Sequence, residues 1–155
     1  MSEDKVNILL VDDLPDNRFV TAFLGLLDTA SHRVVYHAGG QGPILHFHAD
    51  RGACSRHKPT SFPLGAMPLV RPPRVVETTL APGDALVLLS DGVYEYDNGS
   101  GEQFGQDRVE QVVCGHPANG MAALSTALLD AVQAFARGAA QQDDITMVLV
   151  RRGLR

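Results

Sequence analysis

The sequence contains no tryptophan, only two cysteines, and fewer basic than acidic residues, with 13 Lys+Arg against 18 Asp+Glu. Its net charge of -5 argues against a nucleic-acid partner, which would require a basic surface. No apolar run is long enough to cross a membrane, and no basic N-terminal region is followed by the apolar segment of a secretory signal. Cys54 and Cys114 form no disulfide or metal-binding pattern, so we expect reduced thiols in a cytoplasmic protein.

Several catalytic motifs are also missing. There is no Gly-x-Ser-x-Gly elbow to supply the nucleophile of a serine hydrolase, and no glycine-rich loop ending in Gly-Lys-Ser/Thr. Four potential zinc ligands, His46, His48, Cys54 and His57, do lie within twelve positions. Their spacing is irregular, and Cys54 and His57 fall in a segment that we expect to be a loop, so zinc is the less favoured interpretation.

The most informative stretch that is present runs from Leu80 to Glu95. Ala85–Leu89 is an unbroken apolar run, which predicts a strand buried on both faces. Asp91 and Gly92 follow directly, and a carboxylate at the end of a buried strand, next to glycine, can present oxygen to a hard cation. The same pattern fits an Asp91 that only accepts hydrogen bonds in a turn, and this stretch alone does not separate the two readings.

A second stretch places Asp143 and Asp144 directly before the apolar run 145–150. If this run pairs antiparallel with Ala85–Leu89, the end of one strand meets the start of the other. Asp91 and Asp143 would then converge at one edge of a sheet. Two converging carboxylates repel unless a cation lies between them, so the combination favours a metal site.

These two stretches belong to a longer series of motifs. Its members, in chain order, are Phe19–Asp28, Val35–Pro43, Pro63–Gly65, Ser90–Glu95, Gly101–Gly105 and Gln142–Thr146. In this order they resemble the PPM-type phosphatases, the metal-dependent enzymes related to protein phosphatase 2C, and in particular their bacterial SpoIIE-like branch. The resemblance covers residues 19–155.

The resemblance implies an α+β fold that is part of the PPM-type α-β-β-α sandwich, mostly antiparallel sheet with one long C-terminal helix. It implies two Mg2+ or Mn2+ ions and the dephosphorylation of phosphoserine or phosphothreonine proteins, such as an anti-sigma-factor antagonist, in a bacterial two-component or sigma-factor pathway. Asp91 and Asp143 would be the catalytic metal ligands. Gly92 and Asp144 would complete the metal site, with Gly92 giving solvent and substrate access. Of the two adjacent acids, the resemblance favours Asp143 as the ligand, and the alternative role of Asp144 is to cap the strand.

The family pattern is incomplete in this chain. Nothing matches the Gly-Asp-x-x-Gly-His-Gly segment, whose aspartate bridges the two metal ions in the family, and Gly83-Asp84 precedes the wrong strand. The alternative function is therefore a catalytically silent fragment that binds a phosphoprotein or regulatory partner without turnover. A fold without its first strands would leave a sheet edge and an apolar face open, so we also expect self-association.

Residues 1–18 differ from the rest and resemble the first strand of a response-regulator receiver domain. Asp12 and Asp13 match the acidic pair that helps hold magnesium there, but no phospho-accepting aspartate follows. We therefore predict two parts, a truncated receiver-like strand over 1–18 and the C-terminal part of a phosphatase domain over 19–155. A further hypothesis places Asp12, which also follows an apolar run, where the lost Gly-Asp carboxylate would be.

The remaining pattern predicts the secondary structure between these motifs. Strands are expected at 19–27, 33–38, 44–48 and 75–80, with a loop over 50–62 and a short helix over 106–113. A longer helix is expected over 119–137, because Leu124, Leu128, Val132 and Phe135 recur at helical spacing. Asn119 would begin this helix and Gly138 would end it.

Overall fold

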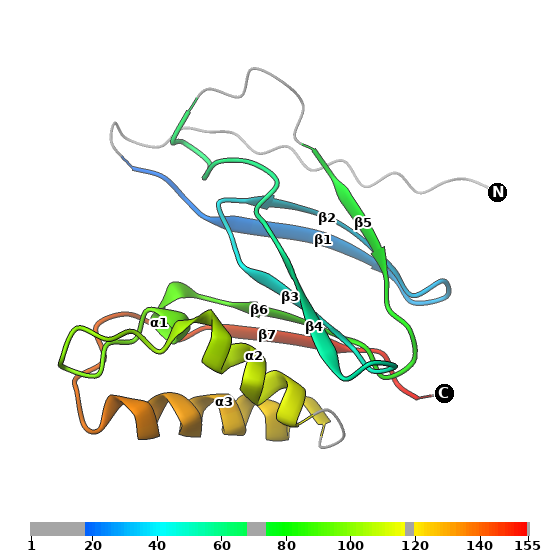
Figure 1. The fold of residues 1–155 in the computed structure, drawn as a ribbon. Coiled ribbons are helices and arrows are strands. Elements are labelled where there is room, and N and C mark those ends of the chain that lie inside the picture. Colours follow the sequence, from blue (N-terminus) through cyan, green and yellow to red (C-terminus); the bar gives the residue numbers. More distant parts are fainter. Residues whose placement is uncertain (1–17, 68–73, 117–119, 155) are drawn as a thin grey trace.

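The computed structural model of the chain describes residues 18–67, 74–116 and 120–154. These residues form two antiparallel β-sheets and a layer of helices (Figure 1). The first sheet has the order β1-β2-β5, with β1 at Ala22–Asp28, β2 at Arg33–Gly39 and β5 at Val76–Thr79. The second has the order β4-β3-β6-β7, with β4 at Ala53–His57, β3 at Ile44–His48, β6 at Ala85–Leu89 and β7 at Met147–Arg151.

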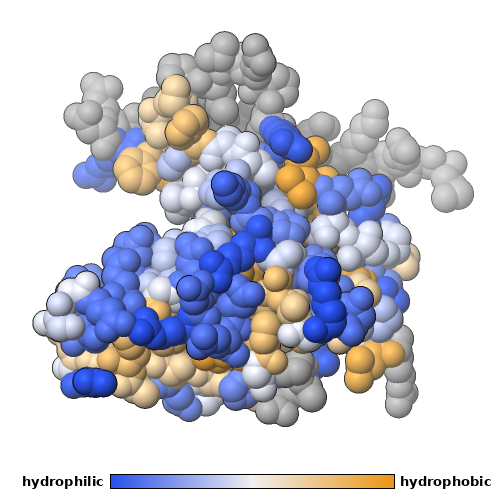
Figure 2. All heavy atoms as spheres, in the orientation of Figure 1, coloured by the Kyte–Doolittle hydropathy of each residue, from blue (hydrophilic) through white to orange (hydrophobic). Residues whose placement is uncertain are grey.

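The helices lie on one side of the second sheet, and the first sheet lies on its other side (Figure 1). They are α1 at Asp91–Tyr94, α2 at Gly105–Gly115 and α3 at Gly120–Ala136. The surface over α2 is mostly hydrophilic, whereas hydrophobic residues gather along α3 (Figure 2). No helix in the described ranges is long and apolar enough to span a bilayer. The expected α+β class and mostly antiparallel arrangement are confirmed.

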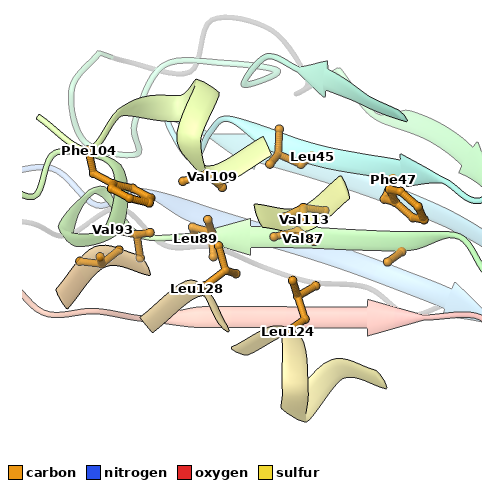
Figure 3. Packing of buried hydrophobic residues seen from close by; sticks show 12 residues of the cluster. Leu45, Phe47, Val87, Leu89, Val93, Phe104, Val109, Val113, Leu124 and Leu128 are labelled. Atoms are coloured by element: carbon orange, nitrogen blue, oxygen red, sulfur yellow. The ribbon is translucent and has the colours of Figure 1, made fainter. Parts of the chain in front are cut away.

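Strand β6 is the centre of this arrangement, and all five of its residues are buried. Val87 and Leu89 face α2 and α3, where they join the larger hydrophobic cluster (Figure 3). Leu86 and Leu88 face the opposite way and pack with side chains of the first sheet. The predicted burial on both faces is therefore correct, because β6 lies between a helical layer and a second sheet.

The long C-terminal helix also follows its predicted stripe. Leu124, Leu128 and Val132 are buried against the second sheet. Phe135 is partly buried and meets the Phe104 ring edge-on, with 5.5 Å between the ring centroids. The helix ends at Ala136, and the two residues that follow, Arg137 and Gly138, are both left-handed, with φ of 50° and 90°. The predicted helix is therefore one residue too long, because the left-handed turn begins at Arg137. The predicted cap, Asn119, lies outside the described residues.

The expected loop over 50–62 is wrong in part, because β4 occupies Ala53–His57 and pairs with β3. The sequence shows no alternation of apolar and polar residues that would predict this strand, since its residues are mostly polar and only half-buried. Tertiary contacts stabilise it instead. Arg56 donates to Glu110 of α2 at 2.8 Å, and to Asp107 at 2.6 Å. The first strand also begins later than expected, at Ala22, because Val20 pairs with Leu64 rather than with β2.

Among the described residues, β1 and β7 are edge strands, and the two sheets are not closed against each other on this side. A cavity of about 560 Å³ lies between them, which we call the open groove. Its lining is mostly apolar and comes from Phe23, Gly25, Leu27, Val34, Gln41, Leu86, Leu88, Leu89, Ser90, Thr146, Val148 and Val150. The described part of the chain therefore leaves an apolar surface uncovered at a sheet edge.

Candidate functional site

The end of β6 lies beside the segment that leads into β7. The two strands are antiparallel, with Leu89 opposite Met147. Ser90 joins the two segments, because its hydroxyl donates to the Asp144 carbonyl at 2.8 Å and accepts from the Thr146 N–H at 2.9 Å. The β6–β7 pairing brings the two segments together, and Ser90, which sequence reasoning did not single out, adds hydrogen bonds between them.

Gly92 follows at the start of α1 and packs against the same segment. A Cβ at this position would overlap the Asp144 carbonyl oxygen and would lie 3.2 Å from that of Asp143. Only glycine allows the two backbones to approach this closely. The sequence suggested that Gly92 would give access to a ligand, and the structure adds a packing role.

A cavity of about 290 Å³, here called the acidic cavity, opens where these segments meet. Its lining residues are Asp91, Gly92, Glu95, Tyr96, Asp97, Gln103, Gln142 and Asp143. The fold thus brings Asp91, Gly92 and Asp143 to one place, and adds Glu95 and Asp97. Asp144 does not line this cavity, and its carbonyl is the acceptor for Ser90.

The acidic cavity has the electrostatics of a cation site. Four carboxylates line it, and no Lys, Arg or His is among the lining residues. Asp91 and Asp143 are exposed, and each accepts one backbone N–H from the residue that follows it, at 3.1 and 2.7 Å. Burial, together with Asp91 and Glu95, raises the pKa of the neighbouring Tyr94 hydroxyl.

Mg2+ and Mn2+ prefer carboxylate oxygens as ligands, so the side chains that line the acidic cavity are of the type that binds a hard divalent cation. Within the described ranges, however, neither Asp91 nor Asp143 belongs to a group of three Asp, Glu, His or Cys side chains whose ligand atoms lie within 4.8 Å of one another. Asp12 and Asp13, the other acids considered from the sequence, lie outside the described residues.

The glycine-rich loop at 39–43 lies next to this region and is held to it by side chains. Gln41 donates from Nε2 to the Leu89 carbonyl at 2.8 Å, and Tyr94 donates from its hydroxyl to the Gly42 carbonyl at 2.9 Å. The loop therefore positions the end of β6 and the start of α1.

The family model of stage II sporulation protein E (SpoIIE) matches residues 4–153 of the chain. The chain belongs to the SpoIIE family. The match starts before Phe19, so it includes most of the segment that the sequence analysis likened to a receiver strand. Comparison with curated proteins gives no significant match.

Several solved structures share the fold. The SiaA-PP2C domain of Pseudomonas aeruginosa superimposes with a TM-score of 0.73 at 21% identity, over 84% of this chain and 51% of that one. The phosphatase domain of SpoIIE from Bacillus subtilis gives a TM-score of 0.66 at 19% identity, over 87% and 57%. The RsbU and RsbW domains of Rv1364c from Mycobacterium tuberculosis give 0.66 at 25% identity, over 86% and 37%. The chain thus spans about half the length of the structures it resembles.

The four potential zinc ligands noted in the sequence, His46, His48, Cys54 and His57, do not come together as one group. Cys54 faces the helices, where its sulfur lies 3.5 Å from that of Cys114, so it does not join His46, His48 and His57. Instead, His46 and His48 lie beside Asp84, with ligand atoms within 4.8 Å of one another. Sequence reasoning missed Asp84 because only the pairing of β3 with β6 brings it there.

Asp84 is buried and held by several donors. Its two oxygens accept the N–H groups of Ala49 at 2.8 Å and Ala81 at 2.9 Å. Burial alone would raise the pKa of Asp84, but these two N–H donors and the His46 ring hold it below its usual value. Burial also lowers the pKa values of His48 and His57.

Proposed function

We propose that this SpoIIE-family chain is a metal-dependent phosphatase that acts on phosphoserine or phosphothreonine proteins in a bacterial two-component or sigma-factor pathway. The observation that supports the proposal is the acidic cavity, which Asp91 and Asp143 both line beside the end of β6. Its carboxylates would hold Mg2+ or Mn2+. Family membership supports the phosphatase chemistry, and an anti-sigma-factor antagonist is the substrate class that the family resemblance favours.

The residues of the acidic cavity would contribute in different ways. Asp91 and Asp143 would bind the cation through their exposed carboxylates, and Ser90 would hold the two segments that carry them at a fixed separation. A bound divalent cation supplies a Lewis acid for the phosphoryl oxygens and a more acidic water. Without a cation, four carboxylates would repel a phosphoryl group, so activity should require added metal.

A second function, binding of a phosphoprotein without turnover, has one specific observation in its favour. Among the described residues only two of the expected metal-binding carboxylates, Asp91 and Asp143, line the acidic cavity, and no three-ligand group includes them. The other two lining carboxylates, Glu95 and Asp97, are not among the expected ligands, so the bridging carboxylate that the family uses would have to come from elsewhere. Asp12 is the candidate within this chain, and the SpoIIE family match begins at residue 4 and so includes it.

The decisive experiment is manganese-dependent hydrolysis of p-nitrophenyl phosphate by the chain and by its Asp91→Asn and Asp143→Asn variants. Activity that requires manganese and falls at least about 100-fold in both variants is expected, because each removes a charged ligand that the reaction needs. Asp130→Asn, an exposed aspartate of α3, is the matched control and should keep full activity.

The same assay separates the two functions. Asp12→Ala tests the third carboxylate, and loss of activity in this variant would support that role. No hydrolysis above the level of Asp91→Asn, in a chain that is folded by circular dichroism, would contradict the phosphatase proposal. Binding of a phosphorylated protein by that inactive chain would then establish the second function.

A further inference from the structure

His46, His48 and Asp84, here called the histidine cluster, lie at the opposite end of β6 from the acidic cavity. Asp84 directly precedes the strand and Asp91 follows it by two residues. At about 3.3 Å per residue, seven residues of extended chain separate the two aspartates by roughly 23 Å. Any ion bound here would therefore be distinct from one in the acidic cavity.

The three side chains are already close enough to surround one ion. Asp84 Oδ2 lies 3.1 Å from His46 Nε2 and 4.0 Å from His48 Nδ1. The two imidazole rings stack with 4.0 Å between their centroids, so both present nitrogen on the same side of β3. In a tetrahedral zinc site with bonds near 2.0 Å, neighbouring ligand atoms lie about 3.3 Å apart, so only small movements are needed.

The surroundings of the cluster also match those of metal-binding histidines. The second nitrogen of each ring faces a hydroxyl group, with His46 Nδ1 3.4 Å from Thr78 Oγ1 and His48 Nε2 2.9 Å from Ser55 Oγ. Asp84 is held by two backbone N–H groups. Hydrogen bonds of this kind, made by the atoms of a ligand that do not touch the metal, orient the ligand. In histidine they also favour the tautomer whose metal-binding nitrogen carries no proton.

We propose that His46, His48 and Asp84 form a zinc site that ties β3 to the turn preceding β6. Two imidazoles and one carboxylate are a set that favours Zn2+ over Mg2+. His46 and Asp84 are each 4% exposed, whereas His48 is 21% exposed, so the ion would enter from the His48 side. Three protein ligands leave a fourth position for water.

Without metal, the His46 proton lies between Nε2 and Asp84, which satisfies both buried groups. Zinc binding at Nε2 would move this proton to Nδ1, where the Thr78 hydroxyl oxygen can accept a hydrogen bond from it, so the ring stays neutral. Asp84 Oδ2 would keep its bond from the Ala81 N–H. The charged residues near the exposed side are Asp50 and Arg51 of the β3–β4 turn, and their opposite charges leave little net repulsion for a cation. Zinc binding at this site does not depend on phosphatase activity.

The test uses the full chain, freed of metal with a chelator and titrated with Zn2+ by calorimetry in excess Mg2+, so that hard-cation sites are filled. Co2+ serves as the spectroscopic probe, because tetrahedral coordination gives strong visible bands. One equivalent of zinc is expected, with binding weakened at least tenfold in His48→Gln and about tenfold in Ser55→Ala, which removes only an outer contact. Zinc should raise the melting temperature of the chain and not that of His48→Gln.

Two controls locate the site. His32→Gln changes a histidine in the β1–β2 turn and should leave zinc binding unchanged. Asp91→Asn alters the acidic cavity and should also leave it unchanged. Zinc affinity that survives in His48→Gln, or no stoichiometric binding by a folded chain, would overturn the proposal, and loss of zinc in Asp91→Asn alone would assign the ion to the acidic cavity.

Discussion

Gly92 shows how a single position can be required by packing and by the candidate site together. Its Cα faces the backbone of Asp143 and Asp144, and any Cβ would meet the Asp144 carbonyl. The Asp-Gly pair in the motif therefore has a steric reason that is independent of metal binding. Replacing the glycine would push apart the two segments that carry Asp91 and Asp143.

We therefore predict that Gly92→Ala destabilises the chain by about 1–3 kcal/mol, the usual range for overpacking against a backbone that cannot move freely. The free energy of unfolding in urea measures this change. Gly115→Ala is the matched control, because a Cβ there has nothing within 4 Å, and its effect should be close to zero. Equal stabilities for the two variants would show that the β6–β7 junction has more room than the structure indicates.

At the scale of secondary-structure elements, the edge strand β4 depends on its contacts with α2. Arg56 forms ion pairs with Asp107 and Glu110, and on the same face of the strand Cys54 lies 3.5 Å from Cys114 across 60 residues of chain. The sequence analysis expected two reduced thiols, and both cysteines are free in the structure. Because the two sulfur atoms are only 3.5 Å apart, oxidation of this pair would join the sheet to the helices.

Oxidation with diamide, which accepts the two electrons, should convert this pair into an intramolecular disulfide. Burial and the neighbouring Cys114 thiol raise the pKa of Cys54 above its ordinary value, so the reaction should be slow at neutral pH and faster as the pH rises. Closing a 60-residue loop would stabilise the chain by up to about 4 kcal/mol, seen as a higher melting temperature. Cys114→Ser should show neither effect, and two thiols still titratable after alkaline oxidation would contradict the prediction.

At the scale of the whole molecule, the described residues form three layers, whereas the resemblance implies a sandwich with helices on both outer faces. The open groove lies between the edge strands β1 and β7, where Leu27 and Val148 are about half exposed. Such an edge, lined with apolar side chains, is a surface on which another strand can pair. The expected self-association remains a prediction, and the open groove is the surface that we assign to it.

Light scattering over a range of protein concentrations should give a mass above that of a monomer. Val148→Lys places a charge at the rim of the groove and should shift the chain toward the monomer. Leu129→Lys, an exposed leucine on α3, is the control and should not. A monomeric mass at every concentration would show that the groove is closed within one chain.

Much of this arrangement follows from local sequence. The apolar run of β6, the stripe of α3 and the turn between β1 and β2 are determined by residues next to one another, since burial and helical periodicity leave a local pattern. The Asp91 and Asp143 motifs likewise identified the family and the candidate metal ligands, because strand ends and glycine constrain a few adjacent positions.

Only the tertiary structure decided the contacts between distant segments. The polar strand β4 forms because Arg56 and Cys54 find partners on α2, and Ser90 joins β6 to the segment before β7. Asp84 reaches His46 because β3 pairs with β6. The free energy of such contacts depends on which strands become neighbours in the fold. The order of residue types within one segment does not determine which strand it will pair with.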